Sequence, residues 1–268
     1  MDKAVILARG LGTRMRKADA QARLSEEQAR TADTGTKGMI PIGRPFLDYV
    51  LAALADAGYR RVCLVIGPDS DLLRDYYTKL PIERFTIDFA IQQEPLGTAD
   101  AVAAAEQFTG CDDFLMINSD NYYPVSAVRA LRELDGEALA AFTRDGLLRG
   151  GNAPADRLMT FSVIERDAAG NMVRIHEKPD ESIIARLPEP ILVSMNCWRF
   201  GPTIYQACRS IEPSPRGELE IPDAVQYAID KLDRTYRVLS FEEPVLDLSF
   251  RSDVASVQEK LAAMEIQL

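Results

Sequence analysis

The apolar positions of the chain fall into short runs that alternate with longer amphipathic stretches. Residues 5–7 and 61–66 are rich in large or β-branched side chains, which is typical of buried strands. Between them, residues 45–57 place their apolar side chains on one helical face, start with a proline and precede Gly58, which predicts a helix. The alternation continues with a predicted helix and strand at residues 71–80 and 85–92. This order predicts an α/β fold, with a parallel sheet covered by helices on both faces.

The second half of the chain continues the pattern with more turn residues. Apolar runs predict strands at residues 114–117, 138–143 and 193–200. An amphipathic stretch predicts a helix at residues 125–134. Residues 158–164 and 172–176 flank the turn residues Ala169-Gly170-Asn171, which predicts a β-hairpin. Residues 145–156 are rich in glycine and proline and are expected to form a loop.

A glycine-rich turn follows the first predicted strand directly. With Gly10 and Gly12, such a turn exposes several backbone N–H groups on one side, which can cradle a phosphate. The next residues add a hydroxyl and fixed positive charge, from Thr13, Arg14 and Arg16. A Walker loop is excluded because no Gly-Lys pair is present here. The dinucleotide fingerprint does not fit either, since Met15 stands where that motif has a small residue.

This turn resembles the signature loop of the nucleotide-sugar pyrophosphorylases, the sugar-1-phosphate nucleotidyltransferases. Their loop reads Leu-(Ala/Gly)-(Ala/Gly)-Gly-x-Gly-Thr-Arg-(Met/Leu), and the matching residues are Leu7, Ala8, Gly10, Gly12, Thr13, Arg14 and Met15. Arg9 departs from the pattern, because the family has a small residue there. Its side chain could turn away from the phosphates, add a charge to the triphosphate or mark a diverged subfamily. The resemblance implies that the loop, with Arg9, binds the nucleotide and that Arg14 is catalytic.

Two further segments resemble the nucleotide half of the family. Lys37 stands in a Lys-x-(Met/Leu)-(Leu/Ile)-Pro segment, which implies a catalytic contact to phosphate. Gln92, Gly97 and Thr98 stand in a segment similar to Gln-x-x-x-x-Gly-Thr-(Ala/Gly)-x-Ala, which implies that Gln92 reads the nucleobase while the other two pack against it. Since ligands bind at the carboxyl ends of strands in an open α/β sheet, this loop is expected beside the glycine loop.

Two aspartates are candidate ligands for Mg²⁺. Asp120 follows a buried strand, where a carboxylate would point into the ligand crevice. It resembles the metal-binding aspartate of the family's Gly-Asp segment, with Ser119 in place of the glycine. Asp247 resembles the second metal ligand in the pattern Asp-x-Gly-Thr-Pro-Glu-Asp-Leu, although Ser249 and Phe250 replace the Gly-Thr pair. The resemblance therefore implies that Asp120 and Asp247 hold Mg²⁺.

The sugar-binding residues are expected in the second half. Glu177 and Lys178 stand in a segment that resembles the family's Glu-Lys-Pro. The resemblance implies that the glutamate contacts the sugar hydroxyls and the lysine contacts the sugar phosphate. Asn196 could reach a sugar hydroxyl or bond to the backbone as a buried asparagine. Residues 217–223 closely match another family segment and open a predicted helix. A Tyr-Gly pair lines the family's sugar pocket. Arg157-Leu158 stands near that place, so sugar recognition is expected to differ.

The resemblance extends from residue 5 to residue 254 and implies one Rossmann-like domain of the GT-A type over residues 1–268, with a mixed, mainly parallel sheet. Residues 1–125 would form its nucleotide-binding half and 126–254 its sugar-binding half. Residues 17–36 are polar and are expected to form a mobile flap, with a short helix at 25–30 and a loop at 31–36. The implied reaction converts an NTP and a sugar 1-phosphate into an NDP-sugar and pyrophosphate.

The composition of the chain restricts the classes of molecule that it is expected to bind. A net charge of −10 argues against nucleic acid and anionic membranes, while local basic clusters still allow anionic small substrates. No apolar run is long enough to span a bilayer, and no signal-peptide pattern is present. The cysteines Cys63, Cys111, Cys197 and Cys208 lie far apart, which favours reduced thiols in a cytoplasmic protein. With His176 as the one histidine, a multi-histidine metal centre is excluded. Whether the chain forms a homo-oligomer stays open.

Two alternatives come from other classes of protein. A catalytically silent regulatory homologue that binds nucleotide-sugars would explain Arg9, Ser249 and Phe250, and it predicts ligand binding without pyrophosphate release. An NAD(P)-binding reductase would explain the succession of strand, glycine loop and helix. However, an acidic partner for the ribose is not evident near residues 63–69, after the second strand.

Overall fold

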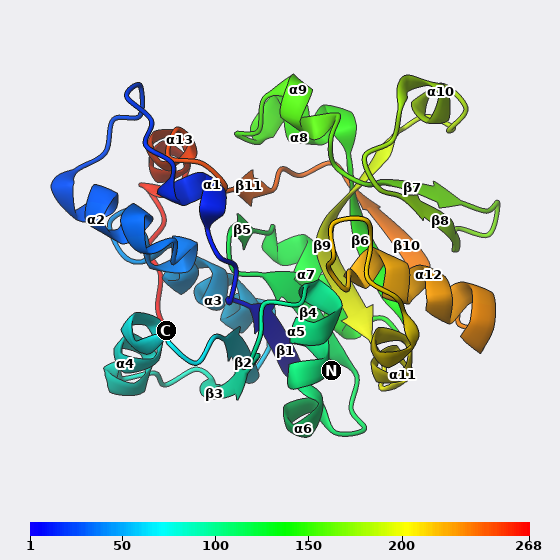
Figure 1. Cartoon of the computed structure of the whole chain (residues 1–268), viewed down its shortest axis with the longest axis horizontal. Coiled ribbons are helices and arrows are strands. Elements are labelled where there is room, and N and C mark those ends of the chain that lie inside the picture. The colour runs from blue at the N-terminus through cyan, green and yellow to red at the C-terminus, as the bar shows by residue number, and fades with distance from the viewer.

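A computed structural model describes residues 1–268 and shows a nine-stranded mixed sheet at its centre (Figure 1). Its central path consists, in order, of β10 (Arg237–Phe241), β6 (Ala138–Thr143), β9 (Leu192–Phe200), β4 (Phe114–Asn118), β1 (Lys3–Leu7), β2 (Arg61–Ile66) and β3 (Thr86–Ile91). All neighbours on this path pair in parallel except the two pairs that β9 makes. The mixed, mainly parallel sheet that the family resemblance implies is therefore confirmed, while the antiparallel β9 departs from the all-parallel order that the alternating pattern predicts.

Two small additions complete the strands. β7 (Val163–Arg166) and β8 (Met172–His176) form an antiparallel hairpin that extends β9, and Gly170 in its turn has a φ of +85°. β5 (Asn121–Tyr122) and β11 (Leu246–Asp247) form a separate two-stranded antiparallel sheet. The predicted hairpin is confirmed, whereas β5, β10 and β11 were not predicted, because they are short or alternate weakly.

Helices cover both faces of the sheet, as the alternating pattern predicts. One face packs against α3 (Phe46–Asp56), α4 (Asp71–Lys79), α7 (Val125–Glu133) and α13 (Asp253–Leu261). The other packs against α5 (Thr98–Ala104), α11 (Thr203–Ser210) and α12 (Ile221–Leu232). Successive β1 residues therefore point into different cores: Ala4 and Ile6 into the first, Val5 into the second. None of the helices is both long and apolar enough to cross a lipid bilayer.

The remaining helices are short. They are α1 (Thr13–Arg16), α2 (Glu26–Thr34), the 3₁₀ helix η1 (Lys37–Met39), α6 (Glu106–Thr109), α8 (Arg144–Gly150), α9 (Ala155–Leu158) and α10 (Glu181–Ile184). The loop predicted at residues 145–156 is wrong, because Thr143 caps α8 and Leu147 is buried. The strand predicted from residue 158 starts only at Val163, since Leu158 ends α9 with its side chain in the core.

The predicted flap is more structured than its composition suggests. The loop predicted at residues 31–36 is wrong, because α2 continues to Thr34. A capping box between Ser25 and Gln28 starts the helix, and Ala32 on its inner side is fully buried. Gln28 also donates to the side chain of Gln258 in α13, so α2 and α13 lie side by side (Figure 1). The C-terminal helix thus packs against an element from the first forty residues of the chain.

Candidate active site

Two adjoining clefts open where β1 and β4 end. The first has a volume of about 420 Å³ and the second about 300 Å³. Both are lined by Arg14, Thr98, Asn118, Asp120 and Glu218, so the clefts meet at these residues. The glycine loop and the loop after β3 line the same first cleft, which confirms that they lie together at the carboxyl ends of the strands.

The glycine loop forms one wall of the first cleft, which is lined by Leu7, Ala8, Arg9, Gly10, Gly12 and Thr13. Gly12 has a φ of +59°, and a Cβ atom there would lie 2.2 Å from the carbonyl oxygen of Gly35. Only glycine fits this left-handed position against the end of α2. A Cβ atom at Gly10 would meet nothing within 4 Å, so the backbone there faces open space that a ligand can enter.

Arg9 has a partner outside the glycine loop. Its Nη2 donates to the carbonyl oxygen of Gln93 at 3.0 Å, and its Nε would lie 3.1 Å from a Cβ atom at Gly67. The guanidinium therefore lies against the loops that follow β2 and β3. Its Nε and Nη1 are buried and have no hydrogen-bond partner. Protein atoms cover these two donors, so Arg9 would offer them to a ligand in the first cleft, which it lines, only after its side chain moved.

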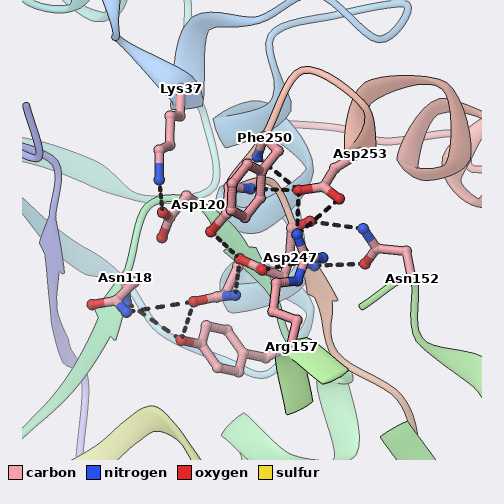
Figure 2. A network of polar contacts seen from close by, with 11 residues as sticks. Lys37, Asn118, Asp120, Asn152, Arg157, Asp247, Phe250 and Asp253 are labelled. Carbon is pink, nitrogen blue, oxygen red and sulfur yellow. Dashed lines mark hydrogen bonds and ion pairs between the residues drawn. The ribbon is translucent and has the colours of Figure 1, made fainter. Parts of the chain in front are cut away.

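Lys37 and Asp120 form an ion pair where the two clefts meet (Figure 2). Lys37 Nζ donates to Asp120 Oδ2 at 2.7 Å, and both side chains are largely buried. Burial disfavours the charged lysine, but the negative charge of Asp120 and the hydrogen bond to it outweigh this effect, so the pKa of Lys37 is raised. Lys37 is therefore cationic at neutral pH, and Asp120 is its counter-ion.

Asp247 reaches the same place through the pairing of β5 with β11, which sets it opposite Asn121, the residue after Asp120. Asp247 Oδ1 accepts from Ser249 Oγ at 2.8 Å and from Asn121 Nδ2 at 3.3 Å. Asn152 bonds to both its backbone N–H and its carbonyl, at 2.8 Å each (Figure 2). The carboxylate is thus held in one orientation. Ser249, which replaces a glycine of the family pattern, supplies one of these contacts.

The second carboxylate oxygen of Asp247 has the properties expected of a metal ligand. Oδ2 is buried and accepts no hydrogen bond. Burial, followed by the charge of Asp120, raises the pKa of Asp247 to about 6, against the opposing effect of Arg157 and Ser249. Nowhere in the molecule do three or more His, Cys, Asp or Glu side chains gather so that they could hold a metal ion by themselves. A pair of carboxylates that lines adjoining clefts suits Mg²⁺, which is commonly bound by one or two carboxylates together with substrate phosphates.

Arg157 does not line the second cleft, contrary to its expected place. Its guanidinium is buried, binds both oxygens of Asp253 at 2.9 and 3.0 Å and lies 3.5 Å from Asp247 Oδ2. It also lies over the ring of Phe250, 5.2 Å from the ring centroid. Phe161 and Ser162 line the second cleft instead. The sequence does not predict helix α9, which holds Arg157 away from the second cleft.

The loop after β3 is locked by contacts to a distant segment. Thr98 Oγ1 accepts from the backbone N–H of Ile221 at 2.9 Å, and a Cβ atom at Gly97 would lie 2.3 Å from the carbonyl oxygen of Leu219. Gln92 is almost fully buried, and its Nε2 donates to the Gly97 carbonyl and to Asp100 at 2.9 and 2.8 Å. Its side-chain NH₂ group therefore shapes the loop, and only its carboxamide oxygen is free.

The second cleft gathers the predicted sugar residues Glu177, Lys178 and Asn196. Lys178 and Asn196 have φ angles of +43° and +55°, which are uncommon for residues with side chains. Backbone strain of this kind clusters at functional sites. Glu177 accepts a short hydrogen bond from Ser162 and lies 4.0 Å from Arg216, which is bound to Glu220. Arg216 was not singled out in the sequence, because a lone arginine in a polar loop carries no signal.

Comparisons with known proteins place the chain in a family. The model of the nucleotidyl transferase family matches residues 3–243. A glucose-1-phosphate thymidylyltransferase of Streptomyces griseus is 31% identical over 229 residues, which are 85% of this chain and 57% of that protein. The UTP–glucose-1-phosphate uridylyltransferase AglF of Haloferax volcanii is 27% identical over 261 residues, which are 97% of this chain and 96% of that protein. The chain thus spans little more than half of the first relative and nearly all of the second.

Solved structures share the fold. A UDP-glucose pyrophosphorylase complexed with UDP-glucose superposes with a TM-score of 0.75 at 17% identity, covering 98% of both chains. A UDP-glucose pyrophosphorylase from Acinetobacter baumannii superposes with a TM-score of 0.72 at 17% identity, covering 99% of this chain and 95% of the other. The comparisons give no support to a reductase. With its two clefts, its glycine loop and a family model that matches nearly the whole length, the chain belongs to the nucleotidyl transferase family.

Proposed function

We propose that this chain transfers a nucleotidyl group from an NTP to a sugar 1-phosphate and releases pyrophosphate. The observation that carries the proposal is the place of Asp120 and Asp247. Asp120 lines both clefts and Asp247 lines the second, while the basic side chains of Arg14 and Lys37 lie beside them. A reaction between two phosphate compounds requires charge neutralisation at the point where the two substrates meet.

The first cleft suits the NTP. The backbone N–H groups of the glycine loop and the Thr13 hydroxyl would bind the triphosphate, and the loop of Gly97 and Thr98 would hold the base. The second cleft suits the sugar 1-phosphate. Glu177 and Asn196 would bind hydroxyls there, and Lys178 the phosphate. A phosphate oxygen of the sugar would then attack the α-phosphorus in line with the departing pyrophosphate, and no side chain has to remove a proton.

Mg²⁺ held by Asp120 and Asp247 would supply positive charge to the phosphates of both substrates. Lys37, bound to Asp120 in the structure, would exchange that carboxylate for a phosphate oxygen when the nucleotide enters. Arg14 forms no ion pair and would bind the pyrophosphate group as charge develops on it. Asp247 is held by Ser249, Asn121 and Asn152 and needs little reorganisation.

The relatives suggest which substrates to try first. They are named for thymidylyl and uridylyl transfer to glucose 1-phosphate. We therefore infer a pyrimidine NTP and a hexose 1-phosphate as the substrate classes. The test is a pyrophosphate-release assay with dTTP, UTP, CTP, ATP and GTP against several sugar 1-phosphates. Nucleotide-sugar binding without any release would instead indicate the silent regulatory homologue.

The metal assignment makes a first prediction. Asp120→Asn should remain folded but lose activity by roughly 100-fold or more, because a neutral amide binds Mg²⁺ poorly and transition-state charge is worth several kcal/mol. Activity and the melting temperature should be measured beside Asp135→Asn, which changes an exposed aspartate in the turn after α7. Wild-type turnover by Asp120→Asn in Mg²⁺ would show that Asp120 is not a metal ligand.

A further inference from the structure

Arg14 is a cation without a counter-ion at the centre of the site. It lines both clefts, and no ion pair or side-chain hydrogen bond holds it. Its guanidinium makes one cation–π contact, to the ring of Phe250, whose centroid lies 5.6 Å from the guanidinium carbon. A guanidinium over a ring face is attracted to the ring and keeps its N–H donors free. The contact therefore orients Arg14 without consuming the groups that bind phosphate.

Phe250 is itself held firmly. Asp253 accepts hydrogen bonds from the backbone N–H groups of Ser249 and Phe250 at 3.0 and 2.7 Å (Figure 2). The same carboxylate binds Arg157, whose guanidinium also lies over the Phe250 ring. Asp253 and Arg157 are buried, so one carboxylate fixes both the backbone of Phe250 and the second cation at its ring.

We propose that Phe250 is a positioning residue that holds Arg14 toward the pyrophosphate moiety of the nucleotide. The inference rests on the proposed function, in which Arg14 binds that moiety. It gives a physical meaning to Phe250, which stands where the family pattern has a small polar residue. A threonine side chain offers no π face to a guanidinium, whereas the phenylalanine ring orients the arginine before substrate enters.

The chain contains a matched control for this contact. Phe108, in α6, also has two cations over its ring, with Lys3 and Arg61 at 5.5 and 5.2 Å from its centroid. Lys3 begins β1, while Leu7 at the other end of β1 lines the first cleft, so Phe108 lies at the far edge of the sheet. Phe108→Leu removes an equivalent cation–π contact without touching the site.

The experiment measures the Kd of pyrophosphate in Mg²⁺ by calorimetry for the wild type, Phe250→Leu, Phe250→Tyr and Phe108→Leu. Leucine keeps apolar bulk and removes the ring, while tyrosine keeps the ring. Phe250→Leu should raise the Kd about two- to fivefold, the factor that a partly exposed cation–π contact is worth. Phe250→Tyr and Phe108→Leu should stay at the wild-type value. If Phe250→Leu does not fold, Phe250→Met replaces it.

A double-mutant cycle separates positioning from a general structural effect. In an Arg14→Met background, Phe250→Leu should cause no further rise in the Kd, because the residue through which it acts is gone. An undiminished effect in that background, or a Phe250→Tyr variant as weak as Phe250→Leu, would overturn the inference. Turnover of the wild type is judged separately: without any pyrophosphate release the proposed function fails, while the Kd ratios still decide the role of Phe250.

Discussion

Arg9 is the residue at which this glycine loop departs from the family pattern, and its guanidinium is bound to the Gln93 carbonyl at the edge of the first cleft. We expect Arg9→Ala to remain folded and active. Its NTP affinity should be unchanged, or weakened by about ten- to 150-fold if Arg9 donates one hydrogen bond to the triphosphate. Calorimetric titration with NTP and Mg²⁺ measures this effect. A wild type that binds no NTP, beside a variant that binds it tightly, would show that Arg9 blocks the cleft.

The backbone conformation and the surroundings of Gly97 leave no room for a side chain at this position. Its φ is +122°, and a Cβ atom would lie 2.3 and 2.7 Å from the backbone of Leu219. Gly97→Ala should therefore reduce the free energy of unfolding by roughly 2–4 kcal/mol and weaken NTP binding. The control is Gly170→Ala, which has a φ of +85° but open space around it and should cost only about 1 kcal/mol. Equal losses in urea unfolding would contradict the close approach.

At the scale of elements, the predicted flap divides into an exposed stretch at residues 17–24 and the packed helix α2. In the free protein, amides of residues 17–24 should exchange quickly, and those of the last turns of α2 at least about tenfold more slowly. NTP with Mg²⁺ should slow exchange in residues 17–24, because Arg14, which lines both clefts, lies shortly before the segment. Hydrogen exchange measured by mass spectrometry tests this. No protection on NTP binding would show that the segment is not a flap.

At the scale of the whole molecule, the pairing of β5 with β11 joins Asp120 to Asp247 from distant parts of the chain. A ligand that binds both should stabilise the entire fold. NTP with Mg²⁺ at 100 times its Kd should add about 2.7 kcal/mol and raise the melting temperature by roughly 5–10 °C. Removing Mg²⁺ with EDTA, or the substitution Asp247→Asn, should abolish most of the shift. A shift that survives both changes would place the nucleotide elsewhere.

Much of the fold follows from the sequence because its signals are local. Periodicity within ten residues predicts β1, β2, α3 and the hairpin of β7 and β8, and glycine spacing predicts the phosphate-binding turn. Short or weakly patterned elements such as β10, α8 and α9 escape prediction, because tertiary burial of residues such as Leu147 and Leu158 stabilises them. Sequence motifs identify the residues of the candidate site, but they do not show how these residues lie relative to one another.

The sequence by itself determined the α/β class, the glycine loop and the identity of the two candidate metal ligands, since each depends on residues that are near neighbours in the chain. Only the tertiary structure decided that Lys37 pairs with Asp120, that Arg157 lies beside Asp247 instead of lining the second cleft, and that Phe250 lies under Arg14. These contacts join segments far apart in the sequence. Their energies depend on distance, burial and ring orientation, which arise only when the sheet and its helices have packed.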